Sequence, residues 1–225
     1  MEKTDAEEAF RRFLDERPAL ETLEKFQELM MRYGAAIREV RTKFEVLNDE
    51  FSFRTSRNPI ESISSRIKKP ASIVEKLRRQ GFSLTIDSIE QNLNDVAGIR
   101  VICSFIDDIY MVADLLAKQD DITVIRTKDY IFRPKQNGYR SYHMIVEVPV
   151  FFSDEKRPMR VEIQLRTVAM DFWASLEHQM KYKKGSADRP DIAAELRSCA
   201  ETIAATDARM LGIRKRIEQL QKDED

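Results

Sequence analysis

The chain has 225 residues and a mass of 26.3 kDa, the size of one ordinary domain with room for additional helices. Its 38 Lys and Arg residues are balanced by 39 Asp and Glu residues, and the net charge of −1 argues against a general binder of polyanions. Apolar runs such as 148–152 are far shorter than the roughly 20 residues that span a bilayer, and the acidic N-terminus lacks the layout of a secretory signal. The two cysteines form no CxxC pair, so we expect a cytoplasmic protein without a membrane segment, a disulfide framework or a zinc cluster.

Both ends of the chain have the apolar spacing of long helices. From Leu23 to Leu47 apolar residues recur at alternating steps of three and four, and the same steps run from Leu196 to Leu220 with one polar position, Thr206. Each stripe is typical of a helix that packs on the core, and equally of a helix that also builds a subunit interface. The stripes are Leu23, Phe26, Met30, Tyr33, Ile37, Val40, Phe44 and Leu47, and Leu196, Cys199, Ile203, Thr206, Met210, Ile213, Ile217 and Leu220.

The middle of the chain alternates between strand and helix patterns. A short crossover helix at 109–118 separates two strands and gives a βαβ-like unit, and Asn137–Gly138 is a hairpin signal between two others. A helix at 173–182 follows, before a break at 185–190. The fold class predicted is α/β (α+β), with a small mixed β-sheet flanked by N- and C-terminal helices. The strands are expected at 99–105, 122–126, 128–132, 142–148 and 159–166.

Basic residues gather around the start of a helix that is predicted to begin at Pro70. Arg66 and Lys68 precede the N-terminus of this helix, where unpaired N–H groups and a partial positive charge favour anions. Ser72 can add a hydroxyl donor, and Lys76 lies on the same helix face one turn later. The stretch is a candidate polyphosphate site, although taken alone it fits a solvated basic helix better.

Two acidic residues lie beside predicted strands. Asp95 precedes the strand that contains Arg100, where it either orders a turn or offers a hard oxygen ligand for Mg²⁺. Glu162 shares one strand face with Gln164 and Arg166, and that face is either exposed to solvent or part of a site. Two carboxylates with basic residues nearby are the minimal set for Mg²⁺-dependent transfer of a phosphoryl or nucleotidyl group.

The loop at 133–143 combines aromatic and cationic side chains. Tyr139 could stack on a base, while Lys135, Arg140 and His143 could meet phosphates. A tyrosine beside a turn more often packs at a strand edge, so this loop alone is weak support. His178 lacks the HExxH spacing of a metalloprotease.

Five segments occur in an order that closely resembles the synthetase domain of the RelA/SpoT family, over about residues 50–185. They are Arg66–Ile73, Asp95–Arg100, Lys135–His143, Glu162–Thr167 and Trp173–His178. The resemblance implies a nucleotidyltransferase-like (p)ppGpp synthetase core at 51–185, an N-terminal helical extension at 1–50 and a C-terminal helix at 186–225. The length is that of a single-domain small alarmone synthetase.

Members of this class transfer the β,γ-pyrophosphate of ATP to the 3′-OH of GDP or GTP in the stringent response, giving AMP and ppGpp or pppGpp. By resemblance, Asp95 would bind Mg²⁺, and Glu162 would be the general base for the 3′-OH or a second metal ligand. Tyr139 would stack on guanine and Glu177 would read the base, whereas Asp171 replaces an asparagine of some members and leaves the choice between GDP and GTP open. ATP would be held by Arg66, Lys68, Ser72, Lys76 and Arg100, and the acceptor nucleotide by Lys135, Asn137 and His143.

The resemblance also implies partners and leaves alternatives. Members form homotetramers through flanking helices, for which the two stripes are candidates, and RNA or (p)ppGpp could act as a regulator. A same-fold pyrophosphokinase acting on another acceptor, such as the tRNA 3′ end, would need a broad basic surface that the net charge disfavours. A non-catalytic nucleotide-sensing scaffold would not need both Asp95 and Glu162. An RNA-binding module is disfavoured by the acidic residues between 107 and 121.

Overall fold

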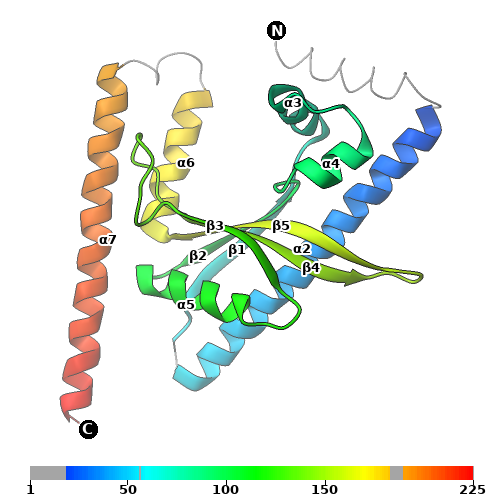
Figure 1. Cartoon of the computed structure of the whole chain (residues 1–225). Helices are drawn as coiled ribbons and strands as arrows, with labels where there is room; N and C mark the ends of the chain where they lie inside the picture. The colour runs from blue at the N-terminus through cyan, green and yellow to red at the C-terminus, as the bar shows by residue number, and fades with distance from the viewer. Residues whose placement is uncertain (1–18, 56, 183–189, 225) are drawn as a thin grey trace.

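The computed structural model describes residues 19–55, 57–182 and 190–224, and its centre is one mixed sheet of five strands (Figure 1). The strands lie in the order β1-β2-β5-β4-β3. They are β1 Ile60–Ile67, β2 Ala97–Cys103, β3 Thr123–Asp129, β4 Tyr142–Phe151 and β5 Lys156–Thr167. The helices are α2 Ala19–Thr55, α3 Pro70–Gln80, α4 Ile86–Asn92, α5 Ile106–Ala117, α6 Val168–Tyr182 and α7 Pro190–Glu224.

The centre of the sheet is a parallel pair, β2 and β5, and the other neighbours are antiparallel. Strand β3 therefore runs in the same direction as β2, and α5 makes the crossover between them. Strands β5 and β4 lie between β2 and β3 in the sheet, so the expected βαβ-like unit is present but split. This split brings the late strand β5 beside the early strand β2.

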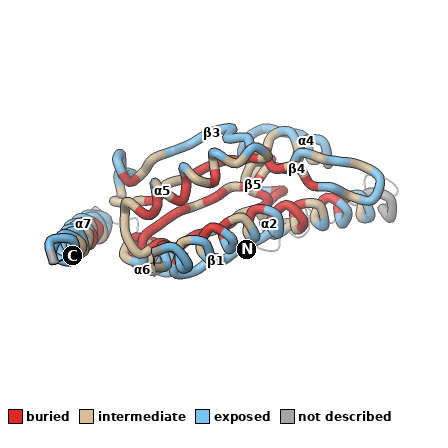
Figure 2. Tube along the Cα trace, turned by 90° about the horizontal axis from the view of Figure 1, so that it is seen from below, coloured by how far each residue is buried: buried red, intermediate tan, exposed pale blue. Residues whose placement is uncertain are grey.

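One face of the sheet carries the main hydrophobic core. Helix α2 contacts β1, β2, β4 and β5, and α5 packs on β2 and β5, so both cover the same face (Figure 2). The apolar stripe of α2 lies in this core, where Val40 and Phe44 are fully buried. The candidate role of this stripe as a subunit interface is therefore wrong for its central residues, because they already contact the strands of their own chain.

The apolar stripe of α7, unlike that of α2, is partly exposed to solvent. Its C-terminal members are exposed: Met210 by 52%, Ile213 by 42%, Ile217 by 51% and Leu220 by 61%. The N-terminal half of α7 packs on α6, where Ala200 is buried and the stripe members Leu196 and Ile203 are partly buried. The outer face of α6 is apolar and exposed as well, at Val168, Phe172, Leu176 and Met180.

The element boundaries differ from the sequence prediction in a few places. Strand β1 and helix α4 were not predicted, and the strands expected at 122–126 and 128–132 are one strand that ends at Asp129. It ends there because Asp129 Oδ1 accepts the N–H groups of Ile131 and Phe132, at 2.8 and 2.9 Å, which is an Asx turn. Asn137–Gly138 lies in loop 130–141, which joins the antiparallel strands β3 and β4, so the predicted hairpin is present with a longer connection than expected. The break at 185–190 lies almost entirely outside the described residues.

Within the described ranges, no helix combines the length and apolar character needed to cross a membrane.

Candidate functional site

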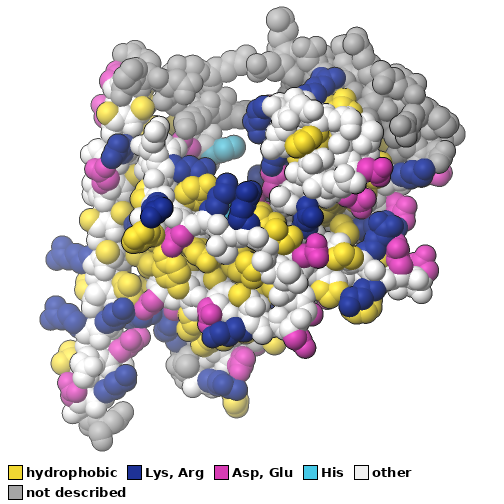
Figure 3. Space-filling model, in the orientation of Figure 1, with side chains coloured by type: hydrophobic (Ala, Val, Ile, Leu, Met, Phe, Trp, Pro, Cys, Tyr) yellow, Lys and Arg dark blue, Asp and Glu magenta, His cyan; other side chains and the backbone are white. Residues whose placement is uncertain are grey.

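The second face of the sheet is polar and open. On β5, Val161, Ile163 and Leu165 point into the core, so Glu162, Gln164 and Arg166 point to the other side. The pocket on this face has a volume of about 570 Å³, which includes the solvent at its mouth. In Figure 3 the Lys and Arg side chains gather around the hollow between α3 and α6. The pocket is lined by Ser64, Ser65, Arg66, Gly98, Ile99, Arg100, Glu162 and Gln164.

The strand register explains why these residues meet. Arg66 on β1 lies opposite Gly98 on β2, and Arg100 on β2 lies opposite Gln164 on β5. His143 on β4 lies opposite the same Gln164. Arg66 and Arg100 therefore lie on the β1 and β2 side of strand β5, which carries Glu162, and His143 lies on the β4 side.

Two lysine side chains form ion pairs with Asp95 beside this pocket. The ammonium groups of Lys68 and Lys76 each lie 2.7 Å from Asp95 Oδ2. Burial raises the pKa of Asp95, but the hydrogen bonds and charges of the two lysines outweigh burial, so the pKa is lowered overall. Asp95 Oδ1 is buried and has no hydrogen-bond partner among the described residues, so one oxygen remains available to a cation.

The N-terminus of α3 is suited to an anion. No side chain of the described residues caps it, its first turn contains Pro70 and no acidic residue, and Ser72 lies half-buried in that turn. Lys68 is fixed just ahead of the helix because its N–H donates to the Val96 carbonyl at 2.8 Å. The structure thus brings the helix end, Lys68 and Lys76 together, as the sequence predicted.

An aromatic and cationic cluster occupies the β4 side of the site. The Tyr139 hydroxyl lies 2.9 Å from His143 Nε2, and Lys135 Nζ lies 4.8 Å from the ring centres of both Tyr130 and Tyr139. Burial, followed by the charges of Arg166, Lys135 and Lys128, lowers the pKa of His143 to about 3. His143 is therefore neutral at physiological pH and offers a hydrogen bond, not a charge, to a ligand.

Two contacts hold the 130–141 loop in its conformation. Asn137 Nδ2 donates to Glu177 Oε1 on α6 at 3.0 Å, and Asn137 Oδ1 accepts the Tyr139 N–H at 3.2 Å. Gly138 has a φ of 88°, and a Cβ at this position would lie 2.5 Å from the Ala200 Cβ on α7. The loop is thus tied to both C-terminal helices.

Arg166 is the residue that sequence reasoning missed. It is 5% exposed, and its guanidinium donates to Asp171 Oδ1 at 2.8 Å, to the Tyr139 hydroxyl at 2.8 Å and to Gln164 Oε1 at 3.0 Å. Asp171 also lies 3.4 Å from Arg100, whose pKa is lowered by burial and then by the charge of Arg166. The alternation along β5 had placed Arg166 on the same face as Glu162, so that pattern could have identified it.

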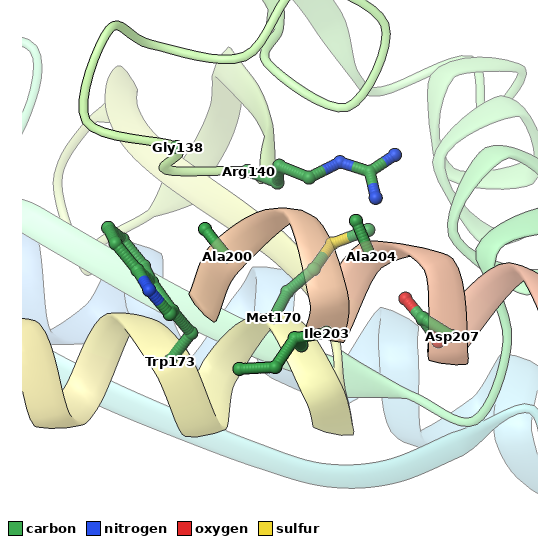
Figure 4. A pocket seen from close by; sticks show the side chains of 8 residues that line it. All are labelled: Gly138, Arg140, Met170, Trp173, Ala200, Ile203, Ala204 and Asp207. Carbon is green, nitrogen blue, oxygen red and sulfur yellow. The ribbon is translucent and has the colours of Figure 1, made fainter. Parts of the chain in front are cut away.

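Arg140 points to a different place. It lines a smaller cavity of about 240 Å³ between the loop and the C-terminal helices, where the other lining residues include Trp173, Ala200 and Asp207 (Figure 4). Its Nη2 donates to the Ile131 carbonyl at 3.2 Å. The predicted phosphate contact therefore fits Lys135 better than Arg140.

The carboxylates fit a magnesium ion that is shared with a substrate. Within the described ranges, no group of three or more His, Cys, Asp and Glu side chains could hold a metal ion. Mg²⁺ is usually bound by one or two carboxylates together with substrate phosphates and water. Asp95, with its partnerless Oδ1, and Glu162 supply that kind of incomplete set.

Residues 65–187 match the family described as "Region found in RelA / SpoT proteins". The chain belongs to the RelA/SpoT family. It is 41% identical over 196 residues to the GTP pyrophosphokinase YwaC of Bacillus subtilis, a match that covers 87% of this chain and 93% of that relative.

Solved structures confirm the fold of this family member. The small alarmone synthetase 1 of Bacillus subtilis bound to its product pppGpp superposes with a TM-score of 0.79 at 34% identity, covering 86% of this chain and 98% of that one. A GTP pyrophosphokinase family protein of Streptococcus pneumoniae gives a TM-score of 0.78 at 35% identity, with coverages of 87% and 96%. The mixed sheet with flanking helices, predicted from the sequence, is confirmed.

Proposed function

We propose that this protein is a small alarmone synthetase that transfers the β,γ-pyrophosphate of ATP to the 3′-OH of GDP or GTP. The observation that carries this proposal is the order of side chains across the open sheet face. Arg66 and Arg100 lie on one side of Glu162, and the cluster of Tyr139 and His143 lies on the other. A single carboxylate between two nucleotide-sized sites suits the activation of one substrate towards the other.

The ATP side consists of Arg66, Lys68, Ser72, Lys76 and Arg100. Arg66 and Arg100 line the pocket, and the N-terminus of α3 supplies free N–H groups next to Lys68. Asp95 Oδ2 forms ion pairs with both Lys68 and Lys76. Phosphate oxygens would compete with Asp95 for these ammonium groups and would free the carboxylate for a metal ion.

Asp95 and Glu162 would hold Mg²⁺ together with the triphosphate, and the bound ion would neutralise the charge that develops on the transferred group. Glu162 would accept the proton of the 3′-OH as the general base. Arg66 and Arg100 would stabilise the phosphates as the leaving AMP separates. The protein thus contributes orientation and charge, which are the main requirements for this kind of transfer.

The acceptor side consists of Lys135, Asn137, Tyr139, His143 and Glu177. Tyr139 would stack on guanine, and Lys135 would meet the phosphates of the acceptor. Glu177 already accepts a hydrogen bond from Asn137, so its reading of the base would require a bidentate arrangement or a rearranged loop. Asp171 is paired with Arg166 and Arg100 through Oδ1, so a contact with guanine would use Oδ2.

We also propose a homotetramer, located in the cytoplasm, whose subunits associate through the exposed stripes of α6 and α7. Eight large apolar side chains on these two helices are more than a third exposed. On each helix they recur at steps of three or four residues and so share one helix face, and exposed apolar surface of this kind is typical of protein–protein interfaces. Regulation by RNA or (p)ppGpp stays a prediction from the family resemblance.

The experiment that tests the function incubates the purified protein with ATP, Mg²⁺ and either GDP or GTP, followed by anion-exchange chromatography. We expect equal amounts of AMP and of ppGpp or pppGpp, and the ratio of the two rates gives the acceptor preference. If no product forms with GDP, GTP, GMP or tRNA, the protein is a nucleotide-sensing scaffold and the proposal is wrong.

A further inference from the structure

Two paths of polar contacts lead from the guanidinium of Arg166 to the carboxylate of Glu162, and in the longer one the last contact, from His143 to Glu162, is 3.8 Å. The short path runs through Gln164, and the long path runs through Tyr139 and His143. Both start at Arg166 Nη2, and they end on different oxygens of Glu162. Arginine can only donate and an ionised carboxylate can only accept, so each path has a fixed direction.

The direction of the short path fixes the amide of Gln164. Its Oε1 accepts from Arg166 at 3.0 Å, and its Nε2 donates to Glu162 Oε2 at 3.0 Å. Rotating the amide by half a turn would place the –NH₂ group against a guanidinium and the carbonyl against a carboxylate. Both contacts would then be repulsive, so one amide orientation is selected.

The direction of the long path fixes the tautomer of His143. The Tyr139 oxygen accepts from Arg166 at 2.8 Å, so its own proton is directed to His143 Nε2 at 2.9 Å. When the hydroxyl donates in this way, Nε2 is the bare nitrogen of a neutral ring and Nδ1 carries the hydrogen, which leaves a donor facing Glu162. Nδ1 faces Glu162 Oε1 at 3.8 Å, which is longer than a hydrogen bond. Catalytic contacts are often this long before substrates bind.

We propose that Arg166 is a positioning residue for Glu162, and that it acts by fixing the Gln164 amide and the Nδ1–H tautomer of His143. This inference rests on the proposed function, in which Glu162 is the general base. Both oxygens of the base then face a donor from β4 or β5, and its remaining lone pairs are directed to the pocket. Tyr139 has a second role beside stacking, because its hydroxyl accepts a hydrogen bond from Arg166 and donates one to His143 Nε2.

Arg166 is well anchored for this task. Its side chain is buried, its Nη1 donates to Asp171 at 2.8 Å, and its Cζ lies 5.2 Å from the Tyr139 ring centre. Asp171, which anchors Arg166, belongs to α6, and α6 directly follows the strand β5 that carries Arg166, Gln164 and Glu162. This arrangement gives Asp171 a role that does not require contact with guanine.

The first test reads the tautomer directly and needs no turnover. The sequence has two histidines, so long-range ¹H–¹⁵N spectra of the nucleotide-free chain contain two ring systems, and His178→Gln identifies the signals of His143. We expect a protonated Nδ1 and a bare Nε2 in the wild-type chain. Tyr139→Phe should move the Nε2 signal and mix the tautomers, while Tyr110→Phe, which removes another hydrogen-bonded hydroxyl, should change neither.

The second test measures turnover of the same variants. Tyr139→Phe keeps the ring but removes the relay, so kcat should fall about tenfold, with the KM for the guanine nucleotide nearly unchanged. His143→Asn, whose amide can replace Nδ1–H, should retain more activity than His143→Gln, whose amide lies at the Nε2 position. Tyr110→Phe should match the wild-type chain.

The outcomes separate this inference from the proposed function. A protonated Nε2 in the wild-type chain, or a Tyr139→Phe variant with unchanged nitrogen signals or unchanged kcat, would overturn the positioning role. A chain with the expected tautomer that is inactive on every acceptor would overturn the function and still support the hydrogen-bond assignment.

Discussion

Gly138 is the point where the 130–141 loop contacts α7. Replacing it with alanine tests whether this contact affects the binding of the guanine nucleotide. Its φ of 88° lies in the left-handed region, which costs an alanine about 1–2 kcal/mol. The added Cβ would also lie 2.5 Å from the Ala200 Cβ, whereas methyl groups normally stay about 3.5–4.0 Å apart. The loop and α7 must therefore separate by about 1 Å or more.

The two effects add to a measurable loss of stability. Overpacking of this kind typically costs about 1–3 kcal/mol, so Gly138→Ala should lower the free energy of unfolding by about 2–5 kcal/mol. The displaced loop carries Asn137 and Tyr139, so the KM for the guanine acceptor should rise several-fold. The KM for ATP should change little, because its predicted ligands lie on β1, β2 and α3.

Urea denaturation and steady-state kinetics measure these effects, and the chain offers two controls. Gly81 has a φ of 75°, but a Cβ added there would meet no atom of the described residues within 4 Å, so Gly81→Ala should cost the conformational share alone, about 1–2 kcal/mol. Adding Ala200→Gly to Gly138→Ala should relieve the clash and restore the acceptor KM, although glycine in the helix costs about 1 kcal/mol. Equal destabilisation by Gly138→Ala and Gly81→Ala would refute the reasoning.

Four further outcomes are expected. Glu162→Gln should abolish turnover while calorimetric nucleotide affinities stay within about twofold, and a near-normal rate would exclude the role of general base. Tyr139→Ala should weaken the binding of GDP by about 1–3 kcal/mol, and an unchanged affinity would reject the stack. The pKa of Asp95 is lower in the folded chain than its value of about 3.9 in the unfolded chain, so ionised Asp95 stabilises the fold above about pH 3.9 and this stabilisation is lost as the pH falls below it. The free energy of unfolding of Asp95→Asn should therefore decrease less on acidification than that of the wild-type chain. Parallel curves of stability against pH would contradict this. Ile217→Glu on the exposed stripe of α7 should reduce the particle mass in light scattering, and an unchanged mass would place the interface elsewhere.

Periodicity predicted the fold where a segment has one buried side. The crossover helix and the strands at 99–105, 142–148 and 159–166 were found within a few residues of their observed bounds, and the two long helices extend beyond the stripes that predicted them. Strand β1 was missed because its outer residues are exposed at an edge of the sheet and its sequence, IESISSRI, gives little apolar alternation. Helix α4, residues Ile86–Asn92, is too short to produce a helical period.

The site was predictable residue by residue but not as a network. The basic helix start, Asp95 and Glu162 each carry a local signal, because a charge at a helix N-terminus or on the open face of a strand needs an explanation. The strand order cannot be derived from local patterns, yet it is this order that sets Arg100 and His143 on either side of Glu162. Arg166 was overlooked because its partners, Tyr139 and Asp171, come from two other segments.

The same limit explains why equal apolar spacing led to opposite results in α2 and α7. A stripe specifies that one helix face avoids water, but it does not specify what covers that face. Helix α2 crosses four strands and buries its stripe in their core. The N-terminal half of α7 packs on α6 through an apolar cluster that includes Leu196, Ala200 and Ile203. Further along, polar contacts hold α7, such as Thr167 Oγ1 to Asp207 Oδ2 at 2.7 Å and the ion pair of Arg214 with Asp107. Because polar contacts hold the C-terminal half of α7, the stripe residues from Met210 to Leu220 stay exposed, and we propose a second subunit as the partner that would remove them from water.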